Sequence, residues 1–305
     1  LSYGVGSNPS LTVAGDIDSG TGAIVIAAEG SIIQNDETTI SSDGGDVSVQ
    51  ADVIDHDGVG SITQNGSAVI SSNGGEIDLI VDTPGGTGQD ISITNVDAGT
   101  GDVIIVTTGG EIIDNDTTED NDITANYLVL VAEEGIGSAD EIDTTVSYLD
   151  VWNHTGDVNI SNTGDLILEE SSMTSDGLSV NVGGGDVNIS AASTITIDSP
   201  IETSGGDLSL TATTGISQNA YIFTGNDGSG AGNYTADAGT GVYEMLSTSW
   251  IDTTDTGGDG NVSITAGDNI TITDINAGTG TVSLTSTGAS ILDEIGRASC
   301  RERVY

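Results

Sequence analysis

Short runs of alternating apolar and polar residues recur along almost the whole chain, separated by turns rich in glycine. Alternation with a period of two places every second side chain on one face of a β-strand. A further run at 127–134, YLVLVAEE, favours a buried strand over a helix. The pattern predicts strands with one buried face at 23–26, 46–49, 76–81, 90–93, 102–106, 157–160, 165–168, 178–182, 186–189, 207–210, 261–264 and 281–284.

The chain also repeats itself at short spacing. Residues 30–49 and 60–79 are identical at ten of twenty positions, and residues 90–114 align without a gap to residues 269–293. A unit this short cannot bury its apolar face alone, so it must stack on its neighbours. We therefore predict an all-β fold, a β-helix over residues 1–293. The alternative is a tandem of β-sandwich domains, whose repeats would be about 100 residues long.

Two segments depart from this rhythm. Residues 214–258 hold few alternating runs and most of the aromatic residues, which predicts an irregular insertion. Residues 294–304, EIGRASCRERV, contain all three arginines and the one cysteine. That string matches the translation of a common sequencing adapter, so we expect residues 294–305 to be a non-native tail. Together with the start at Leu1, this predicts a fragment of a longer protein.

The charge of the chain excludes some partners. Its formal net charge is −45, with 48 acidic residues and three basic ones. All three basic residues fall in the predicted tail, so no basic stripe is present to hold nucleic acid or anionic lipid. No apolar run is long enough for a membrane helix. Such a chain needs salt or divalent cations to screen its self-repulsion, which favours an extracellular medium.

Several repeat units resemble those of large bacterial surface proteins similar to filamentous haemagglutinin. The units are DAGTGDVIIVTTGGEIID, NAGTGTVSLTSTGASILD and residues 135–168, GIGSADEIDTTVSYLDVWNHTGDVNISNTGDLIL. The resemblance implies a right-handed parallel β-helix, export by a two-partner or autotransporter-like route, and a role as an adhesin stalk or surface display rod. It also implies a host-cell, matrix or polysaccharide receptor, and neighbouring repeats of the same longer chain.

Catalysis is not expected. Polysaccharide lyases on β-helix scaffolds need a cationic group and a base, commonly lysine or arginine, and residues 1–293 contain neither. The densest group of titratable residues is Asp52, Asp55, His56 and Asp57. In an extended strand His56 would point away from Asp55 and Asp57, which is poor geometry for acid–base chemistry. His154, the other histidine, is expected in a surface turn.

The acidic residues suggest one ligand. Calcium takes six to eight hard oxygen donors, and no cofactor other than calcium is expected. The simpler alternative is a solvated acidic face adapted to salt. The candidate calcium ligands are Asp52, Asp55, Asp57, Asp114, Asp116, Asp120 and Asp122, with Glu119 in the same run.

The aromatic residues of the 214–258 segment are the candidate ligand surface. Exposed rings beside carboxylates bind sugars by stacking and hydrogen bonding, so a carbohydrate site in this segment is the alternative function. The same rings would equally form a small core that keeps the segment ordered. These residues are Tyr221, Phe223, Tyr234, Tyr243 and Trp250.

Overall fold

The computed structural model describes residues 2–3, 9–52, 58–82, 86, 88–116, 121–172, 180–225, 228 and 230–293. Within these ranges the secondary structure consists of β-strands, and parallel strands stack as a β-solenoid of about 10 turns. The predicted parallel β-helix is confirmed. The alternative of tandem sandwiches is wrong, because sandwich strands pair antiparallel and the pairs among the described residues are parallel.

The chain divides into two compact units. The first comprises Leu1–Tyr148 and Asn153–Ser161, and the second comprises Leu149–Trp152 and Asn162–Tyr305. Strand β19 (Tyr148–Asn153) contributes residues to both.

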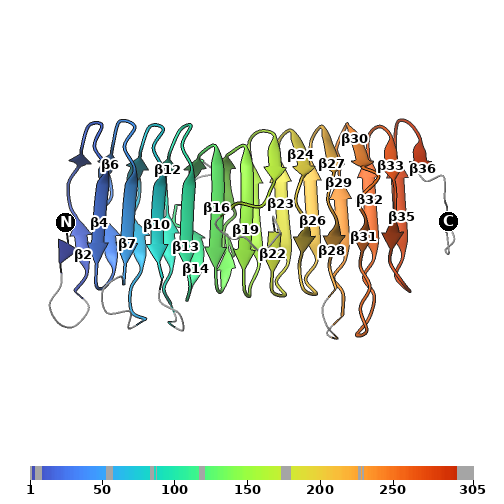
Figure 1. Cartoon of the computed structure of the whole chain (residues 1–305), viewed down its shortest axis with the longest axis horizontal. Helices are drawn as coiled ribbons and strands as arrows, with labels where there is room; N and C mark the ends of the chain where they lie inside the picture. The colour runs from blue at the N-terminus through green and yellow to red at the C-terminus, as the bar shows by residue number, and fades with distance from the viewer. Residues whose placement is uncertain are drawn as a thin grey trace. The chain divides into compact units, whose positions relative to one another are not determined.

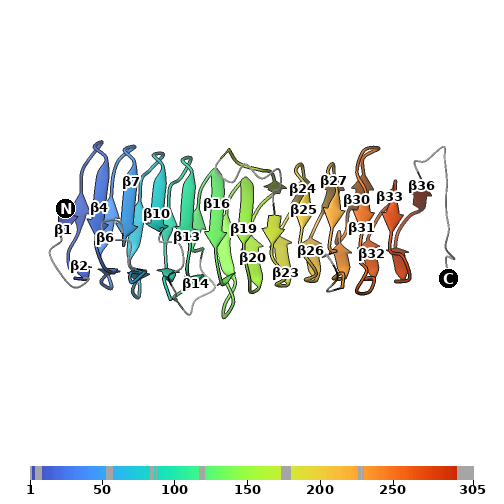
Figure 2. The same cartoon turned by 60° about the horizontal axis from the view of Figure 1, so that its bottom comes forward.

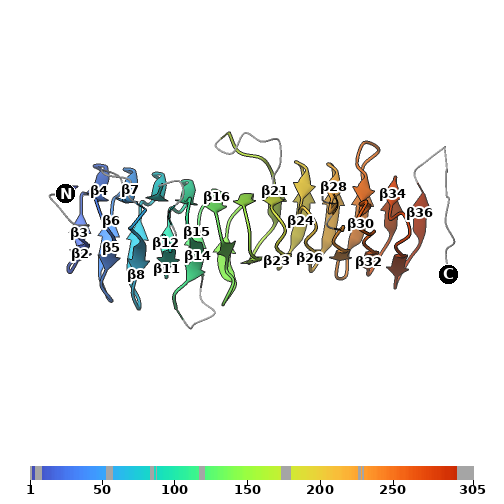
Figure 3. The same ribbon diagram turned by 90° about the horizontal axis from the view of Figure 1, so that it is seen from below.

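The first unit stacks its strands in two parallel sheets, which Figure 1 shows from blue to green. Figure 3 shows the strands of these two sheets on opposite sides of each coil. One sheet contains β1 (Ser2–Tyr3), β4 (Ile24–Ala28), β7 (Val47–Ala51), β10 (Ile77–Val81), β13 (Val103–Thr107) and β16 (Tyr127–Ala132). The other contains β2 (Leu11–Val13), β3 (Ile17–Asp18), β5 (Ile32–Gln34), β6 (Thr39–Ser41), β8 (Ile62–Gln64), β9 (Val69–Ser71), β11 (Ile91–Ile93), β12 (Val96–Asp97), β14 (Glu111–Asp114), β15 (Ile123–Thr124), β17 (Gly135–Ile136), β18 (Ile142–Thr145) and β20 (Val158–Asn162).

The second unit is built in the same way, with β24, β27, β30 and β33 side by side in Figure 2. One sheet contains β21 (Leu166–Leu168), β22 (Val180–Val182), β24 (Thr194–Ile197), β25 (Ile201–Glu202), β27 (Gly215–Gln218), β28 (Ile222–Phe223), β30 (Val242–Met245), β31 (Ile251–Asp252), β33 (Ile270–Ile272), β34 (Ile275–Asn276) and β36 (Ile291–Asp293). The other contains β23 (Val187–Ala191), β26 (Leu208–Ala212), β29 (Tyr234–Asp237), β32 (Val262–Ala266) and β35 (Val282–Ser286).

Interior rows of branched aliphatic side chains form the core. Ile77 on β10 pairs in register with Val47 on β7 and with Val103 on β13, and all three are fully buried. Val47 and Ile77 are separated by one thirty-residue repeat, so this repeat is one coil of the solenoid. Stacking identical faces removes from water the apolar surface that one coil alone would expose.

The longer sequence repeat gives the same strand pattern twice. Residues 90–114 fold into β11, β12, β13 and β14. Residues 269–293 fold into β33, β34, β35 and β36, with strand boundaries at matching positions except that β36 begins one residue later than β14. The repeat therefore encodes a complete series of strands and corners.

A ladder of Asp and Asn side chains connects successive coils at the start of the long strands. In the second unit the backbone N–H of Asn233 donates to Asp207 Oδ1 at 2.7 Å. The N–H of Asn261 donates to Asn233 Oδ1 at 2.9 Å, and that of Thr281 to Asn261 Oδ1 at 2.8 Å. The first unit has the same bond from Glu76 N–H to Asp46 Oδ1 at 3.1 Å. The recurrent acidic residue after each glycine turn thus joins one coil to the next.

Glycines beside this ladder lie where coil backbones come closest. A Cβ on Gly232 would overlap the carbonyl of Gly206, and a Cβ on Gly260 would overlap the carbonyl of Gly232. Because the opposing atoms are backbone, they cannot turn aside as a side chain can. The glycine of the repeated turn is required by this close approach.

The predicted irregular insertion at 214–258 is wrong. Its residues form strands that continue the stack: β27 pairs with β24 and with β30, and β29 pairs with β26 and with β32. The strands were missed because they are short and separated by longer turns, so alternation extends over few residues. The buried strand predicted at 127–134 is observed as β16.

Candidate metal centre

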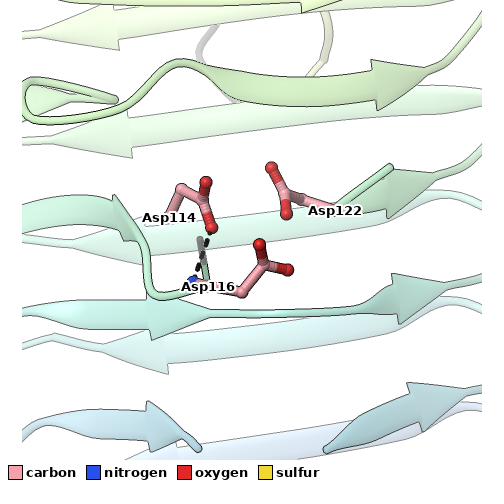
Figure 4. A group of neighbouring side chains, drawn as sticks. All are labelled: Asp114, Asp116 and Asp122. Carbon is pink, nitrogen blue, oxygen red and sulfur yellow. Dashed lines mark hydrogen bonds between the residues drawn. The ribbon is translucent and has the colours of Figure 1, made fainter. Parts of the chain in front are cut away.

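Three predicted calcium ligands meet at one corner of the first unit. Asp114 is the last residue of β14, and Asp122 immediately precedes β15. Asp116 lies on the link between these two strands. The three side chains point toward one another, and one carboxylate oxygen of each lies within 4.8 Å of the others (Figure 4).

The backbone holds two of these carboxylates in place. Asp114 Oδ1 accepts the N–H of Asp116 at 2.9 Å, which closes a tight turn after β14. Asp122 Oδ2 accepts the N–H of Asp143 on β18 in the next coil at 2.8 Å. Asp122 is 1% exposed, and its Oδ1 has no hydrogen-bond partner among the described residues.

Burial makes ionisation costly at this corner. Removal from water raises the pKa of Asp122 to about 8, and the neighbouring carboxylates of Asp114, Asp116 and Asp143 add to that effect. Removal from water also raises the pKa of Asp114 to about 6. Two carboxylates about 5 Å apart repel by roughly 3 kcal/mol at an effective dielectric constant near 20. Ionising all three carboxyls together is therefore unfavourable here, and without a cation Asp122 keeps its proton at neutral pH.

Asp114 belongs to an interior row that is glutamine in two earlier coils and isoleucine in the coil directly before it. Gln34 pairs in register with Gln64, and Ile93 pairs with Asp114. Gln34 Nε2 donates to the carbonyls of Thr38 at 2.9 Å and Val69 at 3.0 Å, so its amide holds the corner that follows. Residues Gln34 and Gln64 were not predicted to matter, although aligning the two thirty-residue repeats places both in QN pairs.

Asp52, the one other predicted metal ligand among the described residues, is not part of this cluster. Asp52 is fully buried elsewhere, where its Oδ2 accepts Gly58 N–H and Gln89 Nε2, each at 3.0 Å. The remaining predicted ligands, Asp55, Asp57 and Asp120, lie outside the described residues, as do Glu119 and His56.

Two of the five aromatic residues cannot form a carbohydrate surface. Tyr234 and Tyr243 are fully buried on β29 and β30, so their proposed role as exposed ligand-binding rings is wrong. The Tyr243 hydroxyl donates to Gln218 Oε1 at 2.6 Å and lies 3.1 Å from the Tyr234 hydroxyl. Burial raises the pKa of both phenols, so both stay protonated. Because the Tyr243 hydroxyl uses its one hydrogen to donate to Gln218, it accepts a hydrogen bond from the Tyr234 hydroxyl.

The other three aromatic residues are half-buried on the outside of the second unit. Tyr221 and Trp250, each directly before a short strand, stack with ring centroids 4.5 Å apart and planes 5° from parallel. The Tyr221 hydroxyl donates to Glu202 Oε1 at 2.8 Å. Phe223 pairs in register with Asp252. Since each stacked ring covers one face of its neighbour, the pair works first as an inter-coil contact.

His154 lies at the surface, as predicted. Its Nε2 is 3.8 Å from Glu133 Oε1, and both side chains are largely exposed. An exposed pair of this kind contributes little to stability.

Comparison with protein-family models, with curated proteins and with solved structures gives no match. No helix capable of crossing a membrane is found in the part of the chain that the structure describes.

Proposed function

We propose that this chain is a non-enzymatic structural segment of a secreted surface protein, in which stacked coils act as a stalk that displays adhesive elements. The observation that carries the proposal is the inter-coil ladder, in which the acidic and amide side chains of the repeated turns bond to the next coil. Side chains used in this way maintain stacking. The resemblance of the repeats to filamentous surface adhesins supports the same role.

Mechanical loading tests this role directly. We expect the full chain, held by its two ends in magnetic tweezers, to unfold in discrete steps. Successive coils are 20 to 30 residues apart in register, so each coil released should add about 70 to 100 Å of extended chain. A chain that extends smoothly at low force, without steps, would contradict a stalk function.

The competing function is carbohydrate binding, for which Tyr221, Phe223 and Trp250 remain candidates because they are half-buried. A glycan array followed by titration of any hit distinguishes the two functions. We expect no saturable binding that depends on Trp250. The matched control is Tyr127→Ala, since Tyr127 stacks on Tyr148 in the first unit with centroids 5.5 Å apart. Binding lost in Trp250→Ala and retained in Tyr127→Ala would favour a carbohydrate-binding protein.

A further inference from the structure

The corner formed by Asp114, Asp116 and Asp122 differs from the same corner in earlier coils. There, Gln34 and Gln64 supply amide donors to backbone carbonyls: Gln64 Nε2 donates to Asn95 O at 3.2 Å and Ala68 O at 3.4 Å. In the Asp114 coil the donor is replaced by a carboxylate, which can only accept when ionised. A hydrogen-bond donor is therefore missing from this corner, and Ile93, the residue before Asp114 in the row, supplies none either.

Asp122, the residue that faces Asp114, adds a further hydrogen-bond acceptor to this corner. Ile123 pairs with Val96 and Val96 with Ile70, so Asp122 occupies the position of Asn95 and Val69 in earlier coils. Its Oδ2 makes the inter-coil bond to Asp143 N–H, as Asp16 Oδ1 does to Thr39 N–H at 2.9 Å. Its Oδ1 is buried, lacks a hydrogen-bond partner among the described residues and belongs to a carboxylate turned toward Asp114 and Asp116 (Figure 4).

Among the residues that the structure describes, the chain has no lysine or arginine for this corner. It contains three basic residues in all, and these are the arginines at 297, 301 and 303. Asp140 and Asp143 add further negative charge near Asp114. Within the described residues nothing neutralises the three carboxylates, so a proton or a cation from solution does so.

We propose that Asp114, Asp116 and Asp122 bind one calcium ion. The ion takes the place of the neutral N–H donors that glutamine supplies in two earlier coils, and it holds Asp116 beside Asp114 and Asp122. Carboxylate oxygens are hard donors, and three carboxylates with water completing the shell satisfy calcium's six to eight oxygens. Asp116 is only half-buried, which leaves the ion a path to solvent. Magnesium is disfavoured because it requires octahedral geometry and releases water reluctantly.

Isothermal titration of the full chain with calcium chloride tests the site. We expect one saturable site, with affinity for calcium at least about tenfold above that for magnesium. Asp122→Asn should weaken calcium binding about tenfold or more, because a neutral amide replaces the buried ligand. Asp116→Asn, at the half-exposed rim, should weaken it less and guards against a folding defect in the buried variant.

The matched control is Asp102→Asn, which removes the same charge from the same unit. Asp102 Oδ1 accepts Tyr127 N–H at 3.2 Å and is not part of the cluster. Calcium should also raise the thermal midpoint of the wild type and of Asp102→Asn more than that of Asp122→Asn, at equal calcium concentration and matched ionic strength. No saturable heat, or equal calcium effects in Asp122→Asn and Asp102→Asn, would overturn the proposal. The test does not depend on the stalk function, since a calcium site without stepwise unfolding would leave this inference intact.

Discussion

At the scale of single residues, the repeated Gly–Asp pair of the turns serves two separate purposes. The glycine permits two coil backbones to approach, and the acid or amide that follows accepts an N–H from the next coil. The high Gly and Asp content of the chain is thus largely a requirement of stacking. Composition alone suggested solvation or cation binding for the same residues.

Substituting one glycine tests the close approach. Gly260→Ala should destabilise the second unit by about 2–3 kcal/mol, because its Cβ would overlap the backbone of Gly232 and the coils must separate to admit it. Gly164→Ala is the control, since a Cβ there would meet nothing within 4 Å. Denaturant unfolding followed by circular dichroism measures both variants. Equal stability of the two variants would show that the coils separate to admit the Cβ of residue 260 without loss of stability.

Asp78 predicts a pH effect on stability. Burial raises its pKa to about 6, with Glu76 and Asp46 adding repulsion. Because the folded-state pKa lies above the unfolded value of 3.8, the stabilisation is complete below pH 3.8 and is lost as the pH rises through 6. Between pH 4 and 7.5 the wild type should lose about 1 kcal/mol relative to Asp78→Asn, after allowance for solvent screening.

The measurement is urea unfolding of both proteins at pH 4, 6, 7.5 and 8.5. Between pH 7.5 and 8.5 Asp78 stays ionised, so the difference between the two proteins should be constant there. A difference that is constant over the entire range would mean that Asp78 titrates normally.

At the scale of the strand, a buried polar network joins β27, β29 and β30. The two tyrosine hydroxyls and Gln218 form a chain in which Tyr234 donates to Tyr243 and Tyr243 donates to Gln218. Gln218 Nε2 in turn donates to the carbonyls of Ala220 and Trp250. Aromatic residues in a solenoid interior require such partners, because an unpaired buried hydroxyl is costly.

The direction of the hydrogen bonds in this network predicts unequal losses of stability for two similar substitutions. Tyr243→Phe leaves both Gln218 Oε1 and the Tyr234 hydroxyl without their partner, so it should lower the free energy of unfolding by about 2–4 kcal/mol. Tyr234→Phe removes only the hydrogen bond that the Tyr243 hydroxyl accepts, and Tyr243 keeps its own bond to Gln218. The free energy of unfolding should therefore fall by about 1 kcal/mol. Thermal unfolding of the two variants checks the order. The reverse order would mean that the hydrogen bonds run the other way.

The strands that sequence analysis recovered are those with several alternating residues. The predicted segment at 46–49 is observed as β7, and that at 207–210 as β26. Strands of two residues, such as β12 and β25, were not predicted, because two residues cannot display a period. Their neighbours in adjacent coils define them, and that information is not local in the sequence.

The candidate site was predicted only in part. The acidic run containing Asp114 and Asp122 was identified, but so was Asp52, which the fold satisfies with amide donors. Which carboxylates converge depends on the register of β14 and β15 against their neighbours. Likewise, burial of Tyr243 follows from its pairing with Ile216 and Ile270, not from its own segment.

At the scale of the whole molecule, the charge has one sign throughout residues 1–293, which hold 46 of the 48 acidic residues and none of the three basic ones. Hydrogen bonds from backbone N–H groups in the ladder offset part of this negative charge. Few of the described carboxylates are buried, so most of the charge faces solvent. The remaining repulsion must be screened by ions.

Sodium chloride should therefore raise the thermal midpoint by several degrees between 20 mM and 500 mM, as the screening length falls from roughly 20 Å to roughly 4 Å. Choline chloride at equal ionic strength is the control, since a bulky cation screens without occupying a small site. Equal effects of the two salts would assign the rise to screening. A midpoint that does not change with either salt would contradict a repulsive surface.

The ladder of Asp and Asn side chains also has a direction. In each of its bonds described above, the accepting oxygen belongs to the earlier coil and the N–H belongs to the later one. A coil that has just formed thus presents ready acceptors to the chain that follows it. Such a protein can acquire its structure progressively as it emerges from a ribosome or an export pore, with each turn serving as the template for its successor.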